Sequence, residues 1–179
     1  MSIKVKLIYA ISDTGVIGVG DGLPWRSPTD LRNFKELTIG HCVVMGKRTF
    51  DGLPRRSKPL PSRDTVVLTS NLVDRAAVSE PMDGWDHVWS ARSVDDAIRR
   101  AEMLGRSEIW FCGGVGVIKA ALPYAVEAYV THVEGFTTES EDVVTLDYRI
   151  EADTSWVTSE LALMFKDGPH SFQLMRYNR

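Results

Sequence analysis

One carboxylate, Asp30, stands in a segment whose pattern predicts a helix with an apolar face. Ser27 is a favourable N-cap and Pro28 suits the first helical position, so we expect a helix that continues to Thr38. Asp30 and Phe34 are four residues apart and therefore share a face of this helix. A carboxylate beside apolar side chains loses solvation, which raises its pKa and suits it to proton transfer. The alternative, that Asp30 only caps the helix, stays open on this segment alone.

A second segment combines a glycine with two cations. Gly46 follows a predicted buried strand at residues 41–45, and Lys47 and Arg48 come next, at the predicted start of a helix. Basic side chains at a helix N-terminus oppose the helix dipole, and a bound phosphate would account for them. Solvated surface charge is the alternative explanation of this pattern.

Glycines also separate a predicted strand at residues 108–112 from a predicted helix at residues 117–122. Gly113, Gly114 and Gly116 lie in this connection. A strand, a glycine turn and a helix can bind phosphate, although the spacing here departs from the full dinucleotide fingerprint. A tight turn between strand and helix would explain one glycine better than three, so the segment predicts a phosphate site.

Two loops and one strand carry further candidates. Residues 14–23 contain four glycines and several apolar side chains, which predicts either a mobile lid or a solvated connector. Residues 53–64 form a stiff, basic, proline-rich loop whose Arg63 could hold a carboxylate. The hydroxyl of Thr131 lies in an apolar strand, where it needs a hydrogen-bond partner.

Apolar runs predict the elements that position these residues. Strands are predicted at residues 5–11, 41–45, 65–68, 87–89, 108–112 and 125–134, with a closing antiparallel hairpin at 156–165 and 171–177. Helices are predicted at residues 27–38, 94–104 and 117–122 and after Gly46, with a surface excursion at 72–88 and an acidic loop region at 136–153. This order predicts an α/β fold, a single domain over residues 1–179 with a central, mostly parallel twisted sheet, an antiparallel C-terminal edge and flanking helices. Because several candidates follow strands, we expect the site at the carboxyl edge of the sheet.

Composition narrows the class of protein. The chain has 179 residues and a net charge of −3 without a basic stripe, so we expect no nucleic-acid partner. No signal peptide or membrane-spanning run is readable, and the chain is expected to be cytoplasmic. Cys42 and Cys112 lie in apolar runs and are expected to be free thiols, while the four histidines lack metal-ligand spacing, so we expect no metal. The sequence also shows no apolar pattern typical of a subunit interface, so we expect a monomer.

The motifs, taken in order, resemble those of dihydrofolate reductases over nearly the whole chain. They are Ile8-Tyr9-Ala10, Val16-Ile17-Gly18, Leu23-Pro24-Trp25, Pro28-Thr29-Asp30-Leu31 with Phe34, Val44-Met45-Gly46-Lys47-Arg48-Thr49, Pro59-Leu60-Pro61 with Arg63, Leu68-Thr69-Ser70, Gly113-Gly114 and Tyr129-Val130-Thr131-His132. Each motif alone is weak, whereas the whole series in this order is highly specific. The resemblance implies a dihydrofolate reductase-like fold and reduction of 7,8-dihydrofolate to 5,6,7,8-tetrahydrofolate by hydride transfer from NADPH. It also implies a role in one-carbon and thymidylate metabolism, and antifolate inhibitors as ligands.

The resemblance further implies roles for individual residues. Asp30 would bind the pterin and assist protonation at N5, Thr131 would bond Asp30 or the pterin, and Trp25 would order a water molecule. The substrate site would comprise Ile8, Tyr9, Leu23, Leu31, Phe34, Leu53, Lys58, Leu60, Arg63 and Cys112. The NADPH site would comprise Ala10, Ile17, Gly18, Gly20, Gly22, Gly46, Lys47, Arg48, Thr49, Leu68, Thr69, Ser70, Arg92, Gly113, Gly114, Val115, Gly116, Val117 and Ile118. Arg63 would hold the glutamate carboxylate of the substrate, the basic residues of the NADPH site would surround the 2′-phosphate, and residues 113–116 would take the pyrophosphate across a cis Gly–Gly bond.

The chain departs from the family pattern at several positions. Cys112, Val115 and Ile118 replace a usual aliphatic residue, a glycine and an aromatic residue, the loop at residues 55–58 is longer than in compact bacterial relatives, and Ser140-Glu141-Asp142 replaces a Gly-Asp-Thr turn. One alternative is a related NADPH-dependent reductase of another heterocycle, such as a riboflavin-pathway intermediate, against which the Asp30 helix argues. Another is a non-catalytic nucleotide- or pterin-binding module, which would bind NADPH without turnover.

Overall fold

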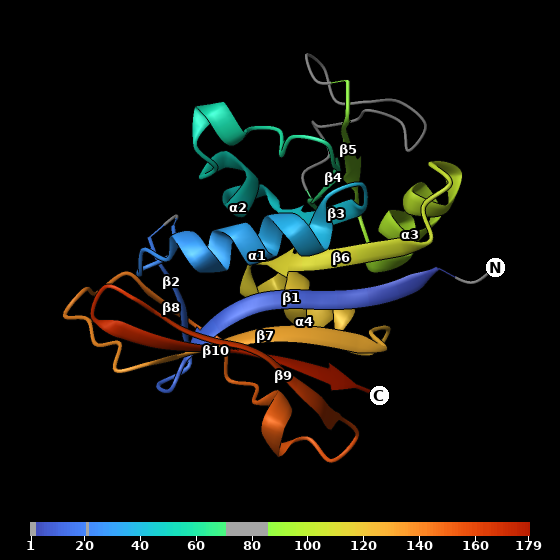
Figure 1. The fold of residues 1–179 in the computed structure, drawn as a ribbon. Coiled ribbons are helices and arrows are strands. Elements are labelled where there is room, and N and C mark those ends of the chain that lie inside the picture. The colour runs from blue at the N-terminus through green and yellow to red at the C-terminus, as the bar shows by residue number, and fades with distance from the viewer. Residues whose placement is uncertain (1–2, 21, 71–85) are drawn as a thin grey trace.

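A computed structural model describes residues 3–20, 22–70 and 86–179, and a twisted sheet runs through them (Figure 1). Within these residues the sheet has eight strands in the order β5-β4-β3-β6-β1-β7-β10-β9. The strands are β1 (Lys4–Ser12), β3 (Cys42–Gly46), β4 (Asp64–Leu68), β5 (Val88–Ala91), β6 (Glu108–Gly113), β7 (Glu127–Glu134), β9 (Val157–Asp167) and β10 (His170–Asn178). All pairings from β5 to β7 are parallel, and β10 pairs antiparallel with both β7 and β9. The predicted mostly parallel sheet with an antiparallel C-terminal edge is therefore confirmed.

Helices cover both faces of this sheet. They are α1 (Pro28–Thr38), α2 (Lys47–Asp51), α3 (Val94–Met103) and α4 (Val115–Ala121), with short 3-10 turns η1 (Arg55–Ser57) and η2 (Ile150–Ala152). Side chains alternate along β1, so Ile8 faces a core shared with α1 and α2, whereas Leu7 and Tyr9 face a core shared with α3 and α4. This alternation places the helix that carries Asp30 and the glycine turn before α4 on opposite faces of the sheet.

The predicted loop at residues 14–23 is wrong in part, because it contains a strand. Strand β2 (Val16–Val19) pairs antiparallel with β8 (Val143–Thr145), which lies in the region predicted as an acidic loop. The pairing satisfies backbone groups, and Val16 is buried against a core that includes Trp25 and Phe136. The two segments are more than 120 positions apart, so neither sequence alone indicates its partner.

Several other element boundaries differ from prediction by one or two residues. Helix α4 begins at Val115 rather than at residue 117, because the Gly114 carbonyl already accepts from the N–H groups of Val117 and Ile118. Strand β5 begins at Val88 and continues to Ala91, beyond the predicted 87–89. The predicted surface excursion at residues 72–88 lies, up to residue 85, outside the described residues.

Candidate active site

Two cavities adjoin at the carboxyl edge of the parallel strands. The larger has a volume of about 640 Å³ and the smaller a volume of about 390 Å³. Six residues line both cavities: Tyr9, Ala10, Gly22, Leu23, Thr49 and Cys112. A molecule in one cavity would therefore lie against a molecule in the other.

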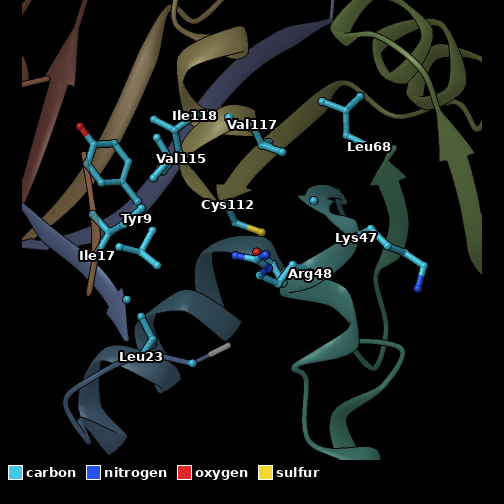
Figure 2. A pocket seen from close by; sticks show the side chains of 18 of the residues that line it. Tyr9, Ile17, Leu23, Lys47, Arg48, Leu68, Cys112, Val115, Val117 and Ile118 are labelled. Carbon is cyan, nitrogen blue, oxygen red and sulfur yellow. The ribbon is translucent and has the colours of Figure 1, made fainter. Parts of the chain in front are cut away.

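The larger cavity gathers every residue predicted for the NADPH site. They come from β1, β2, the start of α2, the end of β4, Arg92 and the turn into α4. Figure 2 shows Lys47 and Leu68 on one side of this cavity, Ile17 and Leu23 on the other, and Cys112 between them. Val144 of β8 also lines this cavity, and sequence reasoning missed it because its contact depends on the β2–β8 pairing.

The glycine turn gives this cavity a wall of exposed backbone. The Gly113–Gly114 peptide bond is cis, as the resemblance implied. A Cβ built on Gly113 or Gly116 would meet no atom within 4 Å, so the space beside both residues is open. At the basic end of the cavity, Lys47 Nζ lies 2.5 Å from the Asp51 carboxylate and is held in place by it. Open backbone beside a helix start, together with basic side chains, can bind a phosphorylated molecule.

The smaller cavity is mainly apolar and contains one carboxylate. Of the residues predicted for the substrate site, it is lined by Ile8, Tyr9, Leu23, Leu31, Phe34, Leu53, Leu60 and Cys112, and also by the predicted catalytic residues Asp30 and Thr131. Sequence reasoning missed Asn33, Leu37, Met45, Gly52, Pro54 and Leu174 in this wall. Asn33 and Leu37 are three and seven residues after Asp30 on α1, a spacing that could have indicated them. Leu174 could be predicted only from the strand order, which places β10 beside β7.

Asp30 is held at the start of α1 with its carboxylate in this cavity. Ser27 caps the helix by accepting from the Asp30 N–H across 3.1 Å, so the Asp30 side chain is free for another partner. That partner is Thr131 on β7, whose Oγ1 donates to Asp30 Oδ1 across 2.7 Å. Burial raises the pKa of Asp30, the Thr131 hydrogen bond opposes this shift, and the nearby Asp167 carboxylate adds to it. The site thus holds a carboxyl group that takes up a proton more readily than an exposed aspartate.

Three predicted residues lie around the smaller cavity without lining it. Trp25 is buried edge-on against Phe136 at 5.3 Å between ring centroids, and among the described residues its Nε1 has no hydrogen-bond partner. Arg63 is buried, and its Nη1 donates to Thr38 Oγ1 across 3.1 Å. Lys58 Nζ lies 4.6 Å from the centre of the Phe50 ring of α2.

The thiol between the two cavities is uncharged. Cys112 Sγ donates to the Val44 carbonyl at 3.3 Å, and burial raises the pKa of this thiol to about 12. Cys42 is also free, and burial raises its pKa to about 12 as well. Cys112 therefore acts as a small apolar wall residue at neutral pH.

Comparisons with known proteins agree with this geometry. The family model described as "Dihydrofolate reductase" matches residues 4–168. The dihydrofolate reductase of Mycobacterium leprae is 40% identical over 153 residues, covering 86% of this chain and 84% of that protein. The dihydrofolate reductase of Mycobacterium tuberculosis strain H37Rv is 37% identical over 166 residues, covering 90% and 94%. A solved dihydrofolate reductase from Enterococcus faecalis, complexed with NADP(H) and RAB-propyl, superposes with a TM-score of 0.76 at 28% identity, covering 98% of this chain and 96% of that chain.

The larger cavity has basic and glycine-rich walls, and the smaller cavity holds one half-buried carboxyl group. Together with these matches, the two cavities define an NADP-dependent oxidoreductase. More particularly, the chain belongs to the dihydrofolate reductase family. In the part of the chain that the structure describes, no group of three or more His, Cys, Asp or Glu side chains is placed to hold a metal ion. No helix among these residues is both long and apolar enough to cross a membrane.

Proposed function

We propose that this protein reduces 7,8-dihydrofolate to 5,6,7,8-tetrahydrofolate with NADPH, and that Asp30 assists protonation of the pterin at N5. The observation that carries the proposal is the Asp30–Thr131 pair in an apolar cavity of about 390 Å³ that shares a wall with the larger cavity. Two planar molecules placed in these cavities would meet at Ala10 and Cys112. Such alignment supplies a large part of the rate of a transfer between two bound molecules.

The residues of the larger cavity fit a phosphorylated dinucleotide. Lys47, Arg48 and Arg92 would bind the 2′-phosphate by charge, which favours NADPH over NADH. The open backbone at residues 113–116 would receive the pyrophosphate. Ala10, together with Ile17, Gly18, Gly20 and Gly22 of the predicted lid, would cover the nicotinamide and exclude water. When bound, the reduced nicotinamide supplies the hydride.

The walls of the smaller cavity fit the rest of the substrate. Its apolar side chains would hold the pterin and benzoyl rings, and Arg63 would bind the carboxylate of the glutamate tail with Lys58 nearby. The bonds from Arg63 to Thr38 and to the Pro61 carbonyl, the latter 3.2 Å long, support this role, because they fix the plane of the guanidinium.

Asp30 would serve both recognition and proton transfer. Its carboxylate would accept hydrogen bonds from the amino group and ring N–H of the pterin, while Thr131 keeps it in place. A water molecule ordered near Trp25 would carry the proton to N5. The raised pKa of Asp30 supports this assignment, since a carboxyl group that protonates nearer to neutral pH is a better proton source.

We also propose a biological setting for this reaction. The product would serve one-carbon and thymidylate metabolism, the chain would act as one domain and as a monomer, and antifolate inhibitors would bind the smaller cavity. The substitutions at Cys112, Val115 and Ile118 lie in the walls of the two cavities, so they would affect inhibitor and cofactor affinity rather than the reaction.

The test is direct. Purified protein is mixed with NADPH and dihydrofolate, and the absorbance of the reduced nicotinamide is followed, with NADH as the parallel control. We expect rapid loss with NADPH and much slower loss with NADH. No loss, while NADPH still binds by fluorescence, would contradict the proposal and favour another heterocyclic substrate or a binding module.

A further inference from the structure

The turn that joins β9 to β10 reaches the first turn of α1. Asp167, the last residue of β9, accepts from Ser27 Oγ across 2.6 Å and from the Thr29 N–H across 2.9 Å, both at Oδ2. Its Oδ1 accepts from Thr29 Oγ1 across 3.2 Å. The hairpin of β9 and β10 ends beside the start of α1, on the left of Figure 1. A carboxylate about 140 residues further along the chain therefore supports the N-terminus of the helix that carries Asp30.

These hydrogen bonds form a continuous chain from Asp167 to Asp30. Ser27 donates its hydroxyl proton to Asp167 and accepts from the Asp30 N–H with the same oxygen. Two N–H groups of the first helical turn, those of Thr29 and Asp30, are thus bound by side chains. The position of the Asp30 backbone depends on these hydrogen bonds, whereas the Asp30 carboxylate is held by Thr131.

The charge of Asp167 also acts on Asp30. The hydrogen bonds from Ser27 and Thr29 lower the pKa of Asp167, so it is ionised at neutral pH. Of the titratable side chains that line the same cavity, Tyr9 and Cys112 are uncharged at neutral pH, because burial raises the pKa of each. Arg32, on α1, contributes to the lowered pKa of Asp167. Among the described residues, Asp167 is the charged group whose interaction with Asp30 shifts the pKa of Asp30, and it raises that pKa.

We propose that Asp167 is a positioning residue for Asp30, which makes the β9–β10 turn part of the functional site although it lies outside both cavities. The inference rests on the proposed function, because its readout is proton transfer from Asp30. Asp167 lines neither cavity, so it would not touch the substrate. It fixes the position of the first turn of α1 through Ser27, and its charge keeps Asp30 protonated to higher pH.

Two variants separate the effect of the hydrogen bonds made by Asp167 from the effect of its charge. Asp167→Asn keeps the shape and one acceptor oxygen but removes the charge, so the decline of kcat/KM with rising pH moves to lower pH by about 0.2–0.5 pH units. This shift shrinks as salt is added, because exposed charges are screened. Ser27→Ala breaks the chain of hydrogen bonds and keeps the charge, so kcat falls severalfold while the pH of the decline changes little.

A matched control is Asp153→Asn. Asp153 accepts from the Ser155 N–H and hydroxyl at 2.9 and 2.7 Å, so it also supports a local turn, and it lines neither cavity. This variant is expected to keep the wild-type pH profile. Thermal melting of all three variants reports any general loss of stability.

The possible results are distinct. If Asp30→Asn reduces turnover at neutral pH but Asp167→Asn keeps the wild-type pH profile, the role of Asp167 is overturned and the proposed function stands. A lower melting temperature of Asp167→Asn with an unchanged pH profile overturns it too, since this result describes a structural cap. If Asp30→Asn has full turnover at neutral pH, the role proposed for Asp30 itself fails.

Discussion

Thr131 and Asp30 are 101 positions apart in the chain and are joined by a hydrogen bond of 2.7 Å. One lies in the interior of β7 and the other in the first turn of α1. The bond satisfies the buried hydroxyl of Thr131 and fixes the orientation of the Asp30 carboxylate in the smaller cavity. It also favours the ionised form of Asp30, in opposition to burial.

Replacing Thr131 by valine keeps the volume of the side chain and removes the donor. Because the Thr131 hydrogen bond lowers the pKa of Asp30, Thr131→Val raises that pKa further. The decline of kcat/KM with rising pH should therefore move to higher pH, opposite to the shift expected for Asp167→Asn. Steady-state rates across the pH range measure this, and an unchanged profile would contradict it.

Asp30→Asn removes the proposed proton source with almost no change of shape. We expect turnover at neutral pH to fall roughly 100-fold or more, the scale typical of a lost general acid. Turnover should recover in part as the pH falls, because substrate protonated in solution no longer needs the acid. Rates measured from acidic to neutral pH, with Asp153→Asn as control, test this; unchanged turnover at neutral pH would refute the role given to Asp30.

The same substitution should stabilise the fold at neutral pH. Burial raises the pKa of Asp30 in the folded protein above its ordinary value of 3.8, so the folded state binds the proton more tightly than the unfolded chain. This contribution to stability is present below pH 3.8 and is lost as the pH rises through the folded pKa. This loss does not occur in Asp30→Asn. At neutral pH the free energy of unfolding of the variant is therefore higher by about 1.4 kcal/mol for each unit by which the pKa of Asp30 is raised. Urea unfolding at several pH values should give a more stable variant at pH 7 and equal stability at low pH.

Charge at the end of the larger cavity should control the choice of cofactor. In the double variant Lys47→Gln, Arg48→Gln, we expect KM for NADPH to rise roughly tenfold or more, about 1.4 kcal/mol, with little change for NADH. Lys119→Gln is the matched control, because Lys119 pairs with Asp147 and does not line the cavity. An equal effect on both nucleotides would show that these cations do not recognise a 2′-phosphate.

Gly113, at the end of β6, should not tolerate a side chain because of its backbone conformation. Gly113 has a φ of +139°, which L residues rarely adopt, although a Cβ there would meet no atom within 4 Å. Gly113→Ala should therefore destabilise the protein by about 1–3 kcal/mol. Gly116→Ala, in the first turn of α4 with open space beside it, should be neutral or stabilising by less than about 1 kcal/mol. Urea unfolding of both variants decides the matter, and equal losses would contradict this explanation.

Local signals predicted much of the molecule. The Ser27-Pro28 pair identified the start of α1, and the alternation of apolar runs with helical segments predicted the parallel sheet, which the structure confirms. Contacts between distant segments could not be found in this way. Leu174 reaches the smaller cavity only through the strand order, and the support of α1 by Asp167 depends on where a hairpin turn falls in space.

The wall shared by the two cavities has a thermodynamic consequence. Occupants of the larger and smaller cavities would each cover Cys112, Ala10 and their neighbours, so each would become part of the binding surface of the other. Their affinities are then linked, and by reciprocity any factor by which the first ligand tightens binding of the second applies equally in reverse. A small molecule selected against the protein with the larger cavity empty would consequently be ranked on a different surface from the one it meets when that cavity is filled.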